Sequence, residues 1–200
     1  MSDATVQEEP EIDLEKVDDE RLKEQLRQVI EFDGFLSAGV AIGVFMLNHG
    51  CAILGCQLED DLFVTAETTN CLPDAATALA NCTIGNKRLR IANYGKMALS
   101  MTKRDDTNGI RIILDPKKTI KNPVIHAWYL NEREVAHRAV MAEILKAGRD
   151  ILSFEYVRVA IPQKAKKGVV LCVECGEPFI PEKNEEKCKY CFGDRYYEVR

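Results

Sequence analysis

The sequence predicts an α+β fold, in which helices pack on an antiparallel sheet and a small zinc finger follows at the C-terminus. Three observations predict it. Residues 18–31 repeat apolar side chains at helical spacing, and residues 38–47 are apolar on every face. Segments such as GIRIILD alternate apolar and charged residues, as strands with one solvated face do. The last 32 residues carry two CxxC pairs.

Local signals place the helices of the first half of the chain. Ser37 is a suitable N-cap for the apolar helix. Within that helix Gly39 and Gly43 lie one turn apart, so another backbone can approach closely there. Pro73 is placed to begin a short helix over residues 74–80.

Alternating patterns and turn residues place the strands. The expected strands are LFVTAE (62–67), RLRIANYG (88–95), KMALSMTKR (96–104), GIRIILD (109–115) and ILSFEYVRVAI (151–161). Between the last two, Asn131 and Glu134 form a capping box, which predicts a helix over residues 132–146 that ends at Gly148.

Charge and composition divide the chain. It has 200 residues, 46% hydrophobic and 30% charged, with a net charge of −5. We expect an acidic, disordered tail (1–16), an α+β core (17–162), a linker (163–168) and a four-cysteine zinc finger (169–200). The start has neither the basic residues nor the apolar stretch of a secretory signal. The longest apolar run has ten residues, about half of what a membrane span needs. These features predict a cytoplasmic protein without a membrane segment.

The C-terminal cysteines are the strongest chemical signal in the sequence. They follow the pattern C-x2-C-x12-C-x2-C at Cys172, Cys175, Cys188 and Cys191. Two such pairs can close a tetrahedron of thiolates around one Zn²⁺ per chain, and four ligands leave no position for a catalytic water. Nucleic-acid binding is the other function known for such modules. It is disfavoured because the segment holds five basic residues against seven acidic ones.

Three further motifs point to a family. FDGFLSAGVAIG, ETTNCLPDAATAL and NCTIGNKRLRIANYGKMA, in this order and spacing, resemble the core of the family named after the E subunit of formylmethanofuran dehydrogenase. The resemblance implies an α+β core with an auxiliary zinc finger of treble-clef type, and a homodimer. It also implies a metal in a core cleft, held by the histidines and the cysteine of the family's first motif.

This chain departs from the family pattern at that first motif. Asp33, Phe35 and Ser37 stand where the family has His, His and Cys. Phe35 cannot bind a metal, and the Ser37 hydroxyl is a poor ligand for a soft or borderline ion. A second metal in the core cleft, held by Cys71 with help from Asp33 or His49, stays open as an alternative.

The residues that remain define a predicted ligand cleft, formed by Asp33, Glu67, Cys71 and Lys96. Cys71 precedes a helix start, where backbone N–H groups favour a thiolate, so it is the candidate catalytic residue; a merely buried cysteine is the alternative. Lys96 follows a glycine turn and could hold an anionic ligand, or it could simply be solvated. The other core cysteines, Cys51, Cys56 and Cys82, are expected to be structural.

Two classes of function follow from these residues. The first is an accessory protein that binds a small molecule, a metal or a protein partner. The alternative is a redox or metal-assisted enzyme that uses Cys71 and a core metal. For such an enzyme the family resemblance implies one-carbon chemistry like that of methanogenesis. A weaker alternative is a zinc-finger regulator that binds nucleic acid. No glycine-rich phosphate loop, nucleophile elbow or HExxH motif occurs in the sequence, so the commonest enzyme signatures are missing. The loss of His, His and Cys from the first motif favours the accessory class.

Overall fold

The computed structural model describes residues 14–104, 106–161 and 168–198. Most of the predicted tail (1–16) and of the predicted linker (163–168) lies outside these residues. Contacts divide the chain into two compact units, residues 1–161 and 162–200, and each is described by itself.

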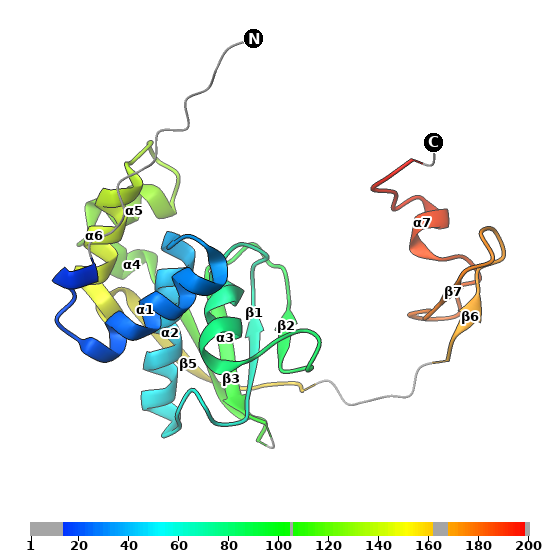
Figure 1. Ribbon diagram of the computed structural model, residues 1–200, viewed down its shortest axis with the longest axis horizontal. Helices are drawn as coiled ribbons and strands as arrows, with labels where there is room; N and C mark the ends of the chain where they lie inside the picture. Colours follow the sequence, from blue (N-terminus) through cyan, green and yellow to red (C-terminus); the bar gives the residue numbers. More distant parts are fainter. Residues whose placement is uncertain (1–13, 105, 162–167, 199–200) are drawn as a thin grey trace, which may run out of the picture. The chain divides into compact units, whose positions relative to one another are not determined.

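The first unit is built on a five-stranded sheet with the order β2-β1-β3-β4-β5 (Figure 1). The strands are β1 (Leu62–Ala66), β2 (Leu89–Ile91), β3 (Ala98–Lys103), β4 (Asn108–Leu114) and β5 (Leu152–Arg158). Neighbouring strands are antiparallel except β1 and β2, which run parallel. The predicted α+β class is therefore confirmed. The parallel pair arises because helix α3 (Leu72–Ala80) connects β1 to β2 and makes a βαβ crossover.

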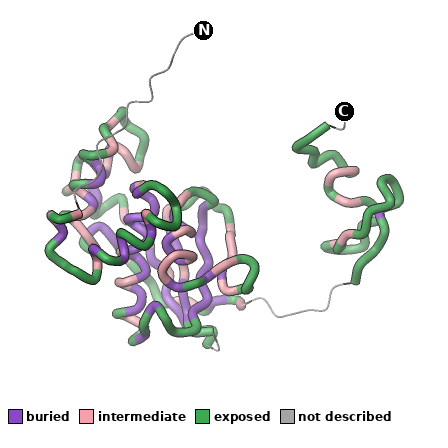
Figure 2. Tube along the Cα trace, viewed as in Figure 1, coloured by how far each residue is buried: buried purple, intermediate pink, exposed green. Residues whose placement is uncertain are grey.

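The helices of this unit gather around α2 (Ala38–Leu54). This helix contains the apolar run predicted over residues 38–47 and continues beyond it to Leu54. The others are η1 (Leu14–Lys16), α1 (Glu20–Asp33), α4 (Pro116–Thr119), α5 (Pro123–Tyr129), α6 (His137–Ala147) and η2 (Gly148–Ile151). α2 packs on β3 and β4, where Met101, Ile110 and Ile112 are fully buried. Purple, buried segments run through α2 and the central strands in Figure 2, so the core lies between this helix and the sheet.

The predicted cap and close approach at α2 are both confirmed. The Ser37 hydroxyl accepts a hydrogen bond from the backbone N–H of Val40 at 3.2 Å. Gly43 faces α3 so closely that an added Cβ would lie 2.7 Å from the Cβ of Ala75. Gly43, one of the two glycines predicted at this helix, thus lets α2 and α3 pack almost backbone to backbone.

The predicted capping box at Asn131 is wrong. The helix there, α6, begins at His137 with no side-chain cap, while α5 occupies Pro123–Tyr129. Asn131 has φ +52°, a left-handed conformation that asparagine tolerates better than most residues, and it lies just after α5. The asparagine therefore follows the end of one helix instead of starting the next, and Pro123 at the start of α5 was the signal that mattered.

The second unit is small and has almost no interior. Strands β6 (Val170–Leu171) and β7 (Pro178–Phe179) form an antiparallel hairpin, and α7 (Lys189–Phe192) follows. Between residues 168 and 198, Cys172 is the one residue that is buried, and nearly all of this unit is green in Figure 2. Hydrophobic burial alone cannot hold a unit of this kind together.

Candidate functional site

The four C-terminal cysteines converge in the second unit. The first pair lies between β6 and β7, and the second pair lies at the start of α7, with Cys188 as the residue before the helix. Their four sulfur atoms all lie within 4.8 Å of one another, and Cys175 Sγ is 3.9 Å from Cys188 Sγ. Tetrahedral zinc with Zn–S bonds of about 2.3 Å separates its sulfurs by about 3.8 Å. The cluster therefore has the dimensions of a four-thiolate metal site.

Backbone N–H donors stabilise the thiolate form of Cys172, the buried cysteine of this cluster. The N–H groups of Cys175 and Cys188 lower the pKa of Cys172 to about 6, and the second of these donors lies 3.4 Å from its sulfur. Gly176 adopts φ +75° and closes the turn with a 2.9 Å hydrogen bond from its N–H to the Cys172 carbonyl. The local fold thus favours the thiolate form that a metal ion requires.

Two residues of the predicted ligand cleft lie where three helices meet in the first unit. Asp33 is the last residue of α1, and half-buried Cys71 precedes α3. Gly39 of α2 faces Cys71, because a Cβ added to the glycine would lie 3.6 Å from the Cys71 Cβ. Asp74 lies here too, and its pKa is raised by burial and by the charge of Asp33.

The positions that carry histidine and cysteine in the family motif have other roles here. The Phe35 ring lies 4.8 Å from the His137 ring, centroid to centroid. His137 Nε2 lies 3.0 Å from the carbonyl oxygen of Leu36, which fixes the imidazole against the same loop. Ser37 caps α2 through its hydroxyl. This loop is therefore held by aromatic and backbone contacts.

The other two residues of the predicted cleft, Glu67 and Lys96, form a second group beside β4. Both carboxylate oxygens of Glu67 accept hydrogen bonds from Arg111, at 2.6 and 2.8 Å. These bonds lower the pKa of Glu67, with a smaller contribution from Lys96. The Glu67 carbonyl also accepts the N–H groups of Tyr94 and Lys96, and Gly95 between them has φ +66°. The Tyr-Gly-Lys motif thus folds back onto Glu67.

The predicted cleft consequently contains two pairs of residues. Asp33 and Cys71 lie at the helix junction, and Glu67 and Lys96 lie together beside β4. Within the described residues no hydrogen bond or ion pair joins one pair to the other. The Glu67 carboxylate is committed to Arg111 through two hydrogen bonds.

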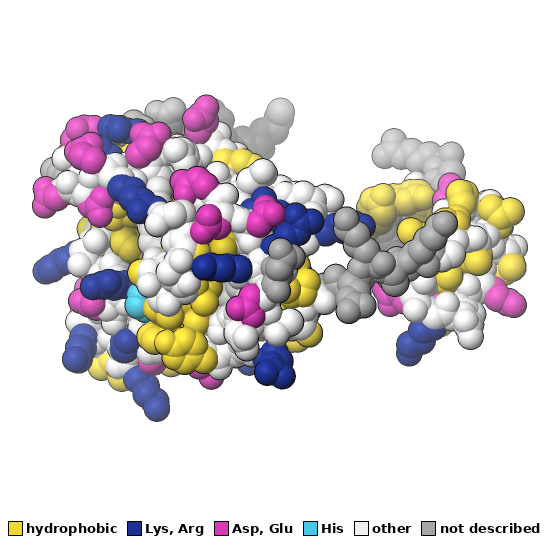
Figure 3. Space-filling view, turned by 90° about the horizontal axis from the view of Figure 1, so that it is seen from below, with side chains coloured by type: hydrophobic (Ala, Val, Ile, Leu, Met, Phe, Trp, Pro, Cys, Tyr) yellow, Lys and Arg dark blue, Asp and Glu magenta, His cyan; other side chains and the backbone are white. Residues whose placement is uncertain are grey.

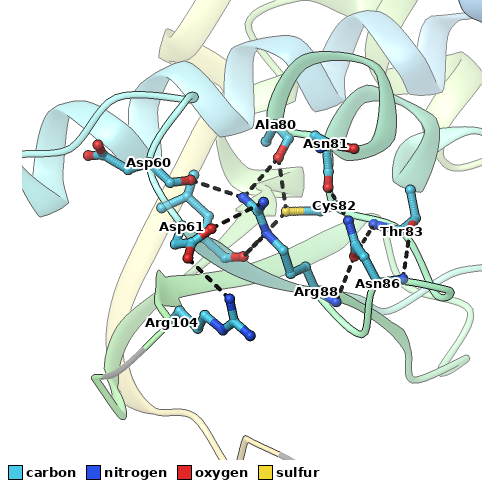
Figure 4. Close-up of polar contacts among 10 residues, drawn as sticks. Asp60, Asp61, Ala80, Asn81, Cys82, Thr83, Asn86, Arg88 and Arg104 are labelled. Carbon is cyan, nitrogen blue, oxygen red and sulfur yellow. Dashed lines mark hydrogen bonds and ion pairs between the residues drawn. The ribbon is translucent and has the colours of Figure 1, made fainter.

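The third motif, NCTIGNKRL, builds the loop between α3 and β2 (Figure 4). Thr83 and Asn86 exchange two hydrogen bonds at 3.0 Å, from backbone N–H to side-chain oxygen in both directions. The Arg88 guanidinium donates to the carbonyls of Asp60, Leu62 and Ala80. The buried Cys82 thiol lies 3.5 Å from the Leu62 and Ala80 carbonyls, and burial raises its pKa to about 11. This motif therefore stabilises the fold, as we expected for Cys82.

Comparison with protein families now identifies the chain. Residues 32–159, well over half of its length, match the family described as "FmdE, Molybdenum formylmethanofuran dehydrogenase operon". The chain belongs to the FmdE family. The predicted resemblance is confirmed, and the three motifs that carried it lie inside the matched region.

Relatives of this FmdE-family chain support the assignment over both units. The crystal structure of a tungsten formylmethanofuran dehydrogenase FmdE-like protein from Syntrophus aciditrophicus is 30% identical, with a TM-score of 0.75, and the match covers 88% of this chain and 95% of that one. A probable S-adenosyl-L-methionine-binding protein of Archaeoglobus fulgidus is 30% identical over 205 residues, which cover 90% of this chain. The chain spans only 55% of the length of that relative.

Two cavities of the FmdE-family core were missed at the sequence level. One, of about 380 Å³, is lined mainly by residues of α1 and α2 and of the segment after α2, including Cys51 of α2 and Cys56 of that segment. The Cys56 N–H donates a hydrogen bond to the Cys51 carbonyl at 3.0 Å, and burial raises the pKa of both thiols. The second cavity, of about 650 Å³, is lined from α2, α4, α6, η2 and β5. The four basic side chains around it come from two stretches of the chain, residues 118–121 and 146–149, so no single motif reveals them. None of the described helices is long and apolar enough to cross a membrane.

Proposed function

We propose that the four-cysteine cluster binds one Zn²⁺ per chain and that this ion has a structural role. The observation that carries the proposal is the near absence of a core in residues 168–198, where Cys172 is the one buried residue. Metal coordination contributes roughly 10–16 kcal/mol in zinc-finger peptides and can replace such a core. Four thiolates fill the tetrahedron of zinc, which fits a structural ion better than a catalytic one.

For the core we propose an accessory, ligand-binding role. The first motif supports it, because Phe35 is packed on His137 and the Ser37 hydroxyl is used to cap α2. Two positions that provide metal ligands in the family pattern are thus occupied by residues with structural contacts. The cleft at Asp33 and Cys71 is the place where a small molecule or a second metal would bind. The alternative, a redox or metal-assisted enzyme, would use Cys71 and a metal at this same place.

Assembly and location are part of the proposal. We expect a homodimer or a complex with a protein partner, as the family resemblance implies, and a reducing compartment such as the cytoplasm. The cysteines support the reducing compartment, because all eight are free thiols in the structure and a thiolate metal site requires reduced cysteines. Light scattering coupled to size-exclusion chromatography tests the first point, since a monomer of 22.5 kDa and a dimer are easily separated.

Metal content by elemental analysis tests the proposed function. The full chain should contain one zinc per molecule, and both Cys172→Ser and Cys188→Ser should contain none. Cys56→Ser is the matched control, because this cysteine is also buried but lies outside the cluster, so that variant should keep its zinc. If Cys172→Ser still retained one metal per chain, a core site would exist. Loss of that metal on mutating Cys71 would then favour the enzyme.

The name of the archaeal relative suggests one ligand to test. Binding of S-adenosyl-L-methionine to the full chain would extend the accessory role to that cofactor, and Cys71→Ser would show whether the predicted cleft is involved. The relative is almost twice as long as the matched region, so its ligand could be bound by the part of the relative that the match does not cover.

A further inference from the structure

The larger core cavity, of about 650 Å³, combines positive charge with an exposed ring. Its walls include the basic side chains Lys118, Lys121, Lys146 and Arg149, together with His49 and Phe154. Its volume falls within the range of small-molecule sites. In Figure 3 a histidine side chain borders exposed hydrophobic side chains, with several lysine and arginine side chains around them.

The charge in this cavity is unbalanced. Its walls carry four basic side chains and a single acidic one, Asp150. Across the described part of the chain, none of the four cations forms an ion pair with a carboxylate. In contrast, Arg88 and Arg111 of the same unit are each paired with an acid. Cations without carboxylate partners around one cavity attract an anion, and phosphate suits both ammonium and guanidinium groups.

One of these cations is held in place. The Lys118 ammonium donates a hydrogen bond to the carbonyl of Leu152, at the start of β5. Lys146 and Arg149 lie at the end of α6 and in η2, so they converge on the cavity from another segment. Charges from separate segments on a fixed frame can surround one phosphate group from several sides.

The aromatic wall lies at the edge strand. The Phe154 ring is 42% exposed and stands edge-on to His49, with centroids 5.6 Å apart. Tyr156, two residues along β5, stands edge-on to Phe154 at 5.7 Å. An exposed ring beside a basic cavity can stack on a heterocyclic base, a contact worth about 1–3 kcal/mol in nucleic-acid binding proteins.

His49 links the two cavities. It lines both of them, as does Arg149, so their spaces adjoin. Its Nδ1 is buried without a hydrogen-bond partner among the described atoms. The pKa of His49 is lowered, first by burial and then by the charges of Arg149 and Lys118. A neutral imidazole does not add to the excess positive charge of the cavity walls, and it presents a flat ring to a ligand.

We propose that this cavity binds a nucleotide. Its phosphates lie among Lys118, Lys121, Lys146 and Arg149, and its base lies against the Phe154 ring. The site is separate from the four-cysteine cluster and from the cleft at Asp33 and Cys71, so the inference does not depend on the proposed function. It differs from S-adenosyl-L-methionine binding, because a cationic sulfonium would gain nothing from four basic side chains.

Calorimetric titration of the full chain tests the proposal, with ATP, AMP, adenosine and inorganic phosphate as probes. ATP should bind more tightly than AMP, and AMP should bind at least about tenfold more tightly than adenosine or phosphate. Lys146→Glu should weaken ATP binding by about tenfold or more. Arg138→Glu is the matched control, since this residue lies at the opposite end of the same helix and does not line the cavity.

A second pair of measurements separates the contribution of the Phe154 ring to binding from that of the basic side chains. Phe154→Ala should weaken the binding of ATP and of AMP by about fivefold and leave phosphate binding unchanged. If the alanine variant misfolds, Phe154→Leu takes its place in the experiment. In the wild type, bound ATP should raise the pKa of His49 in an NMR titration.

Three results would overturn the proposal. The first is no heat with ATP at millimolar concentration, and the second is equal weakening of ATP binding by Arg138→Glu and Lys146→Glu. The third is phosphate or S-adenosyl-L-methionine binding as tightly as ATP with the same sensitivity to Lys146→Glu.

Discussion

In the first unit, α2 and the central strands bury most of their apolar side chains, whereas residues 168–198 bury a single cysteine. The first unit is held by packing, since removal of apolar surface from water is the main driving force of folding. The second has a short hairpin, one helical turn and four convergent sulfurs. Packing spreads stability over dozens of residues, while a metal ion bound at the four sulfurs would concentrate it on four.

The cysteines show the same contrast at the level of single side chains. Burial raises the pKa of Cys51 and Cys82 in the core, which keeps them as inert thiols. Backbone N–H groups lower the pKa of Cys172 in the second unit. One residue type therefore acts as a small apolar side chain in one unit and as an anionic ligand in the other.

Removal of the metal is the strongest way to test this comparison. A chelator, or the substitution Cys188→Ser, should unfold residues 168–198, because coordination worth roughly 10–16 kcal/mol replaces their missing core. Hydrogen exchange followed by mass spectrometry should show fast exchange throughout this segment and unchanged protection in α2 and β4.

The core provides its own control for that experiment. The single tryptophan, Trp128, lies in α5, so its fluorescence reports on the first unit. The urea midpoint for unfolding of the first unit should be the same with and without chelator, since most contacts of each unit are internal. A core that unfolded together with the second unit would show that the ion stabilises the whole chain.

The fold could be predicted where a local signal and a tertiary contact agree. Ser37 caps α2, and its helix has the two glycines at the face that meets α3. The prediction failed at Asn131, because an asparagine in a left-handed turn after one helix resembles the N-cap of another. The parallel pairing of β1 with β2 also escaped prediction, since strand patterns do not reveal which edges meet.

The candidate sites divide in a similar way. The four-cysteine pattern is local, and the spacing of the cysteines was enough to predict the cluster. Glu67 and Arg111 are 44 residues apart, so nothing in the sequence could show that this carboxylate is already paired. The basic cavity at His49 is assembled from five elements, and its side chains meet only once the sheet and helices have formed.

The pair of Glu67 and Arg111 tests how far charge contributes to a core held by packing. Their side chains are 10% and 23% exposed, and they form two hydrogen bonds. Glu67→Gln should destabilise the core by about 2–3 kcal/mol, less than a fully buried pair would lose, because Arg111 keeps its bond to Glu155. Urea unfolding followed by Trp128 fluorescence measures this loss.

The variant Glu155→Gln and the pH dependence of the core's stability refine that prediction. Glu155 contacts the same arginine but is 60% exposed, so its loss should cost about 0–1 kcal/mol. The pKa of Glu67 is lowered from 4.5 in the folded state, so its stabilisation is complete above that value and is lost as the pH falls through the folded pKa. The wild-type core should therefore lose more stability between about pH 5 and pH 2 than Glu67→Gln does. Equal losses in the two proteins would show that this pair is not linked to pH.

Two glycines of α2 test how tightly the core is packed. A Cβ at Gly43 would lie 2.7 Å from the Ala75 Cβ and 3.0 Å from the Leu72 carbonyl oxygen, both on α3. Gly43→Ala should therefore cost about 1–3 kcal/mol, since α2 and α3 must move apart. At Gly39 the nearest atoms would be 3.6 Å away, which is ordinary contact. Gly39→Ala should be neutral or stabilise by up to about 1 kcal/mol, because alanine is the better helix former. Equal effects of the two substitutions on urea unfolding would show that α2 and α3 do not pack as closely as the structure has them.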